Sequence, residues 1–171
     1  TTLVVPTLAS APVVVPGGGP GGPAGVLPSQ LRADPGRLAL LPDFRHWSAT
    51  FGVPVALLEA LDWWESGWQP GVVSSTGAIG IGQLEPATVD FVRQVLLADP
   101  ALDPWNPDDN IEMSARFLRY LLDGTGWQLP SAVAAYYEGL QAEQAGFVDP
   151  TTPSYVHGIL AYTQVFAASG A

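Results

Sequence analysis

Residues 54–71, PVALLEALDWWESGWQPG, decide the fold of this chain. Pro54 is typical of a helix start and Gly67 of a helix end, so the pattern predicts a helix over residues 54–66. This helix is apolar on nearly all sides, which is typical of a helix at the centre of a domain. Glu65 lies in its last turn, close in sequence to three tryptophans: Trp63, Trp64 and Trp68.

The rest of the chain after residue 40 also has the sequence pattern of helices. Apolar residues recur at helical spacing between Pro and Gly, and few runs alternate as strands do. The sequence therefore predicts an all-α domain. Besides 54–66, the expected helices cover residues 42–52, 86–98, 106–124, 130–139 and 153–169.

The amino-terminal part has the composition of a linker. Residues 1–31 carry no charged side chain and are rich in Pro and Gly. We expect residues 1–38 to form a Pro/Gly-rich linker or an extended strap, and residues 39–171 to form the domain. The stretch lacks the basic start and unbroken apolar core of an intact signal peptide, so none is expected in this sequence.

Composition excludes several classes of function. The chain has 6 Lys plus Arg against 16 Asp plus Glu, a net charge of −10, which disfavours binding to nucleic acid. No apolar run reaches the roughly 20 residues that a membrane span needs. His46 and His157 are isolated, and no metal-ligand spacing is present, so neither a metal nor another cofactor is expected.

Glu65 has surroundings that favour a protonated carboxyl. Unpaired carbonyls at the end of a helix disfavour a negative charge, and apolar neighbours raise a carboxyl pKa. A carboxyl protonated near neutral pH can act as a general acid, for example in breaking a glycosidic bond. The neighbouring indoles offer flat faces for sugar rings. The alternative is a rim residue with a solvated head.

Four blocks of the sequence carry a family resemblance. They are ESGWQPGVVSSTGAIGIGQLEPAT (65–88), NPDDNIEMSARFLRYLL (106–122), AVAAYYEG (132–139) and PSYVHGILAY (153–162). In this order they resemble the soluble lytic transglycosylases and goose-type lysozymes. The resemblance implies a lysozyme-like α-helical domain with a glycan-binding groove, and cleavage of the β-1,4-linked N-acetylmuramic acid and N-acetylglucosamine backbone of peptidoglycan.

The resemblance also implies roles for particular residues. Glu65 would be the catalytic acid and then the base, and 1,6-anhydro ends would form. Ser66 and Gln83 would lie in the groove, and Tyr136 would lie close to the catalytic carboxyl. Further candidates for substrate binding are Tyr137, Glu138 and Tyr155, and Glu138 is also a candidate acid near the groove.

This chain departs from the family pattern at several positions. Glu85 replaces a methionine, at a place where goose-type lysozymes have an aspartate linked to hydrolysis. It is either a second catalytic carboxylate or a solvated residue at a helix start. Gly82 also replaces a methionine, Tyr137 and Glu138 replace Asn and Ala, and Thr151 or Thr152 falls where many relatives have Glu-Thr.

The sequence thus predicts an exported, monomeric enzyme of the cell envelope or extracellular space, most consistent with a lytic transglycosylase. The alternatives are a hydrolytic goose-type lysozyme or chitinase that uses Glu85, and a non-catalytic glycan-binding domain. Trp105, Trp127 and Phe147 are expected either to line the groove or to pack in the core.

Overall fold

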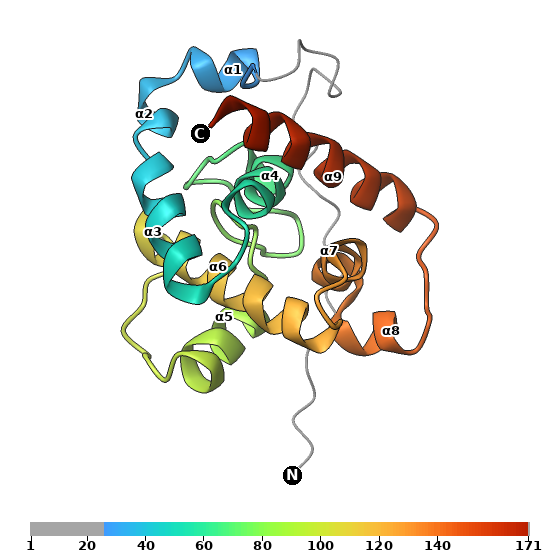
Figure 1. The fold of residues 1–171 in the computed structure, drawn as a ribbon. Coiled ribbons are helices and arrows are strands. Elements are labelled where there is room, and N and C mark those ends of the chain that lie inside the picture. Colours follow the sequence, from blue (N-terminus) through green and yellow to red (C-terminus); the bar gives the residue numbers. More distant parts are fainter. Residues whose placement is uncertain (1–25, 171) are drawn as a thin grey trace.

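The computed structural model describes residues 26–170, and these are mostly helical, with long loops between some of the helices (Figure 1). The helices are α1 Ser29–Arg32, α2 Pro35–Leu38, α3 Leu41–Phe51, α4 Val55–Ser66, α5 Pro86–Phe91, a π-helix Val92–Leu96, α6 Pro107–Gly124, α7 Leu129–Glu138, α8 Leu140–Gln144 and α9 Thr152–Ser169. No strand forms within this range; Val73, Ile79 and Leu84 make only isolated bridges. The all-α prediction is confirmed.

Helix α4 is the centre of the domain, as its apolar sequence predicted. Figure 1 shows it surrounded by α3, α6, α7 and α9, and its packing is most extensive against α9. The helix ends at Ser66 and is capped by Gly67, which has a left-handed conformation (φ 64°) and donates its N–H to the Trp63 carbonyl at 2.8 Å. This turn directs the following chain away from α4 and into the long loop of residues 67–85.

Two helices differ from the expectations, and the exposure of three aromatic side chains decides between two alternatives. The helix predicted over residues 86–98 changes at Val92 from α to π geometry, where the Leu97 N–H donates to the Val92 carbonyl at 2.9 Å. Helix α8 was not predicted. Trp105, Trp127 and Phe147 are 51%, 43% and 57% exposed, so none of them packs in the core.

Residues 29–38, expected as linker or strap, form α1 and α2 instead. Leu31 is fully buried in the core, and the Arg37 guanidinium donates to the Gly67 carbonyl at 3.1 Å. This segment therefore packs on the domain and touches the end of α4. Residues 1–25, where the rest of the expected linker falls, lie outside the described part of the chain.

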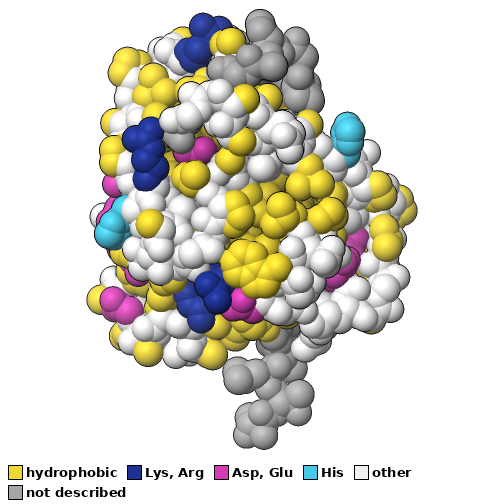
Figure 2. Space-filling view, in the orientation of Figure 1, with side chains coloured by type: hydrophobic (Ala, Val, Ile, Leu, Met, Phe, Trp, Pro, Cys, Tyr) yellow, Lys and Arg dark blue, Asp and Glu magenta, His cyan; other side chains and the backbone are white. Residues whose placement is uncertain are grey.

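The surface is mixed. Figure 2 shows hydrophobic side chains gathered over the middle of one face, with arginines and acidic side chains scattered around them. Across residues 26–170, no helix combines the length and the apolar character needed to cross a membrane.

Candidate active site

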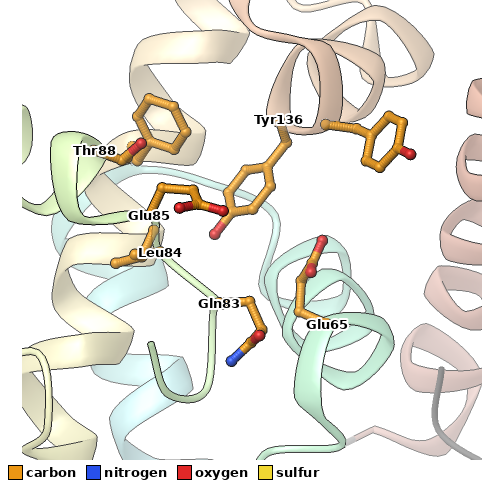
Figure 3. Close-up of a pocket in the computed structure, with 8 residues that line it drawn as sticks. Glu65, Gln83, Leu84, Glu85, Thr88 and Tyr136 are labelled. Atoms are coloured by element: carbon orange, nitrogen blue, oxygen red, sulfur yellow. The ribbon is translucent and has the colours of Figure 1, made fainter. Parts of the chain in front are cut away.

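A pocket opens beside the carboxyl end of α4 (Figure 3). Its empty volume, including the part open to solvent, is about 310 Å³. The end of α4, the 67–85 loop, α5, α6 and α7 all contribute to its wall. The lining residues are Glu65, Gln83, Leu84, Glu85, Thr88, Phe117, Tyr136 and Tyr137.

Glu65 is the buried acid of this pocket. Its side chain is only 4% exposed, and its Oε1 accepts a hydrogen bond from the Tyr155 hydroxyl of α9. Burial raises the pKa of Glu65 from 4.5 to about 8, although the Tyr155 hydrogen bond acts in the opposite direction. The carboxyl is therefore protonated at neutral pH, as the sequence predicted.

The tryptophans around Glu65 do not form a sugar platform. Trp63 and Trp68 are buried in the core, where Trp68 packs on Phe44 with ring centroids 4.5 Å apart. Trp64 contacts Tyr155 edge-on at 6.3 Å. None of the three lines the pocket. They contribute to the burial of α4, and the hypothesis that they hold substrate is wrong for this pocket.

Gln83 has an unusual conformation and an unused acceptor. Its backbone is left-handed (φ 46°), and its side-chain Nε2 donates to the carbonyls of Val72 at 3.2 Å and Gly80 at 3.0 Å. Within the described residues, its buried Oε1 has no hydrogen-bond partner. A buried acceptor on a pocket wall is a group that a bound hydroxyl or N–H can satisfy.

The two tyrosines of α7 play different parts. Tyr136 is buried and its hydroxyl donates to the Gly82 carbonyl at 2.8 Å, so it holds the 67–85 loop. Tyr137 lies partly exposed on the pocket wall, and its hydroxyl is 2.9 Å from Thr151 Oγ1. Its ring packs on that of Tyr155 at 4.9 Å.

Glu85 lies on the same pocket as Glu65. In Figure 3 the ring of Tyr136 lies between the two carboxyl groups. Glu85 is half-buried and accepts a hydrogen bond from Thr76 Oγ1 at 2.6 Å.

Three predicted site residues, Ser66, Glu138 and Tyr155, lie outside the pocket lining. Ser66 is fully buried, and its hydroxyl donates to the Ile81 carbonyl at 2.7 Å and accepts from the Gln69 N–H at 3.2 Å. Glu138 is 4% exposed; its Oε1 accepts from the Asp149 N–H at 2.8 Å and from the Thr152 hydroxyl. Both side chains thus brace loops near the pocket, and Tyr155 reaches the pocket only through Glu65.

Sequence reasoning missed other residues that build the site. Asn110 of α6 accepts from the Gly82 N–H at 2.9 Å and donates to the carbonyls of Ile79 at 3.2 Å and Pro104 at 2.8 Å. Phe117 and Thr88 line the pocket. Asn110 and Phe117 lie within the 106–122 block and Thr88 ends the 65–88 block, so the resemblance was a usable signal. In residues 26–170, no cluster of three or more His, Cys, Asp or Glu could hold a metal ion.

Known proteins are similar to this chain in sequence. The "Endo-type membrane-bound lytic murein transglycosylase A" of Klebsiella pneumoniae is 38% identical over 80 residues, which cover 44% of this chain and 39% of that protein. The chain thus spans well under half of the length of this relative.

Solved structures share the fold. The lytic transglycosylase Slt of Pseudomonas aeruginosa matches with a TM-score of 0.66 and 21% identity, over 74% of this chain and 23% of that chain. The 70-kDa soluble lytic transglycosylase in complex with bulgecin A matches with a TM-score of 0.67 and 25% identity, over 76% of this chain and 24% of that chain. The sequence pattern of the Transglycosylase SLT domain matches residues 43–148, which include Glu65 and the whole pocket lining. This match covers more than half of the chain, and the chain therefore belongs to the Transglycosylase SLT domain family.

Proposed function

We propose that this chain is a lytic transglycosylase that cleaves the β-1,4 bond between N-acetylmuramic acid and N-acetylglucosamine in peptidoglycan. The observation that carries the proposal is Glu65, a buried carboxyl on the pocket wall whose pKa of about 8 keeps it protonated at neutral pH. Protonation of the departing oxygen is what glycosidic cleavage requires. Membership of the family supports this reaction.

In the proposed mechanism Glu65 acts first as an acid. Because Oε1 accepts from Tyr155, Oε2 is the oxygen that is free to carry the proton. This proton passes to the glycosidic oxygen as the bond to the muramyl anomeric carbon breaks. The acetamido oxygen of the substrate stabilises the positive charge left on that carbon. The Tyr155 hydroxyl stabilises the Glu65 carboxylate that results.

Glu65 acts next as a base. Its carboxylate takes the proton of the muramyl 6-hydroxyl as that oxygen attacks the anomeric carbon, so a 1,6-anhydro ring forms and Glu65 regains its proton. No water enters the products. A single acid is sufficient for this sequence, whereas an inverting hydrolase needs a second carboxylate to activate water.

The remaining lining residues provide contacts for the sugar. We assign the unpartnered Oε1 of Gln83 to a hydroxyl or amide N–H of the glycan, and the exposed part of Tyr137 to a sugar face. Tyr136 holds the loop behind the pocket. Ser66 and Glu138 are assigned to positioning, because their hydrogen bonds already brace the neighbouring loops.

Partners and location follow from the substrate. Peptidoglycan strands are the proposed partner, so the chain would act in the cell envelope, and the K. pneumoniae relative is named as membrane-bound. We place the catalytic unit at residues 26–170, because α1 and α2 pack on it.

The decisive experiment is mass spectrometry of the soluble products from purified peptidoglycan. We expect products with anhydro ends, one water lighter than reducing ends, and none from Glu65→Gln. Glu85→Gln is the matched control and should leave anhydro products. If the wild type instead forms products with reducing ends and Glu85→Gln does not, the chain is a hydrolase. Absence of any product from the wild type, with glycan binding retained, would identify a binding domain.

A further inference from the structure

A second carboxyl lies one helical turn before Glu65 on α4. Asp62 is fully buried and does not line the pocket. Its Oδ1 accepts a hydrogen bond from Ser114 Oγ of α6 at 2.7 Å, while its buried Oδ2 has no partner among the described residues. An ionised carboxylate with a bare buried oxygen is costly, so this group requires an explanation.

The contacts of Asp62 lead to the pocket wall. Ser114 Oγ is 3.4 Å from the Tyr136 hydroxyl, which in turn donates to the Gly82 carbonyl at 2.8 Å. Each hydroxyl has one proton, and the short bonds assign these protons to Asp62 and to Gly82. The chain of contacts therefore joins α4, α6 and α7 to the loop that carries Gln83.

This junction is closely packed. A Cβ atom added at Gly82 would lie 2.9 Å from both Cβ and Oγ of Ser114 and 3.1 Å from the Tyr136 hydroxyl. The lack of a side chain at Gly82 thus leaves room for Ser114. The position of the loop depends on where the Ser114 side chain is held, and Asp62 is the acceptor that holds it.

The charge state of Asp62 matters for Glu65. Burial raises the pKa of Asp62 well above its usual value, the nearby Glu65 raises it further, and the Ser114 hydrogen bond lowers it. The ionisable groups that face Asp62 are Glu65 of α4, Tyr136 of α7 and Tyr155 of α9. No cation is among them, so the surroundings of Asp62 disfavour its ionised form.

We propose that Asp62 is a positioning residue that acts as a neutral acid: it holds Ser114, and through it the Tyr136–Gly82 wall, and it keeps negative charge away from the back of Glu65. This inference rests on the proposed function of Glu65. It separates Asp62 from the catalytic residues, because Asp62 touches neither the pocket nor the scissile bond.

Isosteric and truncating variants test this role. Asp62→Asn keeps an acceptor for Ser114 and carries no charge, so we expect kcat within about twofold of the wild type and an unchanged alkaline limb in the pH profile of kcat. Asp62→Ala removes the acceptor, and we expect kcat to fall at least tenfold. The kcat of Ser114→Ala should fall by a similar factor. The kcat of the double variant should be no lower than that of either single variant.

Two outcomes would overturn the proposal. An alkaline limb shifted by a pH unit or more toward acid in Asp62→Asn would mean that Asp62 is ionised and acts by its charge. Full activity in Asp62→Ala or Ser114→Ala would mean that the chain of contacts has no effect on the wall. Circular dichroism and thermal melts of each variant identify loss of folding, and Asp62→Asn keeps the test decisive if Asp62→Ala does not fold.

A second readout does not need turnover. Titration of Glu65 by NMR in protein with ¹³C-labelled glutamate, assigned with Glu65→Gln, should give the same midpoint in the wild type and in Asp62→Asn. A lower midpoint in Asp62→Asn would contradict a neutral Asp62 even in a chain that cleaves nothing. Failure of the proposed function would be recognised separately, by wild-type protein that forms no anhydro products.

Discussion

At the scale of the residue, the site depends on the two oxygens of Glu65. Oε1 is occupied by the Tyr155 hydroxyl, which is held by packing on Tyr137 and Trp64. Oε2 is left for the proton that catalysis uses. The same burial that keeps this proton in place near neutral pH also makes the carboxylate costly after the proton has moved, and the Tyr155 hydrogen bond offsets part of that cost.

Tyr155→Phe should therefore move the pH profile in a defined direction. The hydrogen bond from Tyr155 lowers the pKa of Glu65, so its loss should raise that pKa above about 8 and shift the alkaline limb of kcat/KM to higher pH. We also expect a lower kcat, because the Glu65 carboxylate loses a donor. Initial rates on soluble peptidoglycan fragments from pH 5 to about 10 measure both effects. A limb displaced toward acid would contradict this account of the hydrogen bond.

At the scale of the elements, the central contact is that of α4 with α9. Gly158 of α9 faces the Trp64 ring, and an added Cβ would lie 2.3 Å from two of its carbon atoms. Trp64 also contacts Tyr155 and Tyr162 of α9. A displaced Trp64 ring would therefore collide with these side chains. The absence of a side chain at Gly158 thus leaves room for the Trp64 ring against α9.

Gly158→Ala is expected to destabilise the fold by about 1–3 kcal/mol, the usual cost of overpacking a core. Displacement of Trp64 should also disturb Tyr155 and reduce kcat. Denaturant unfolding of the variant, with Gly71→Ala beside it, measures the first effect. Gly71 is the matched control because a Cβ there would meet nothing within 4 Å, so its unfolding midpoint should stay near that of the wild type. Equal midpoints for the two variants would contradict the packing argument.

At the scale of the whole molecule, α4 carries buried carboxyl groups besides that of Glu65, the one that the proposed reaction uses. Glu59 is fully buried, and neither of its carboxyl oxygens has a hydrogen-bond partner within the described part of the chain. Burial raises its pKa from 4.5 to about 7, against a smaller opposing effect of Arg45. The folded protein therefore retains the proton of Glu59 up to about pH 7, whereas the unfolded chain releases it above pH 4.5.

The stability of the protein should consequently fall as pH rises. The contribution of Glu59 is fully present below the unfolded pKa and is lost as pH rises through the folded pKa, a loss of about 3 kcal/mol between pH 4.5 and 7. Glu59→Gln cannot ionise, so its melting temperature should drop less than that of the wild type between pH 5 and 8. Its product pattern should be unchanged, since Glu59 lies outside the pocket lining. Parallel pH dependences of melting in the two proteins would contradict this.

Much of the architecture was predictable because its causes are local. Pro54, Gly67 and the apolar stretch between them act within a few residues, so α4 and its end follow from sequence, as does the all-α class. The change to π geometry at Val92 and the helical form of residues 29–38 were not predicted. For residues 29–38, burial of Leu31 in the core shows that contacts with residues distant in the chain contribute to their folding.

The sequence by itself determined the helical class, the family and Glu65 as the residue to examine, because periodicity, capping and motif order are properties of neighbouring residues. Only the tertiary structure decided what surrounds that carboxyl. It placed Trp63 and Trp68 in the core, used the Ser66 hydroxyl within a turn, and brought Tyr155 of α9 to Glu65. Burial, and with it the pKa of Glu65, arises from contacts between helices far apart in the chain, which no single stretch of sequence specifies.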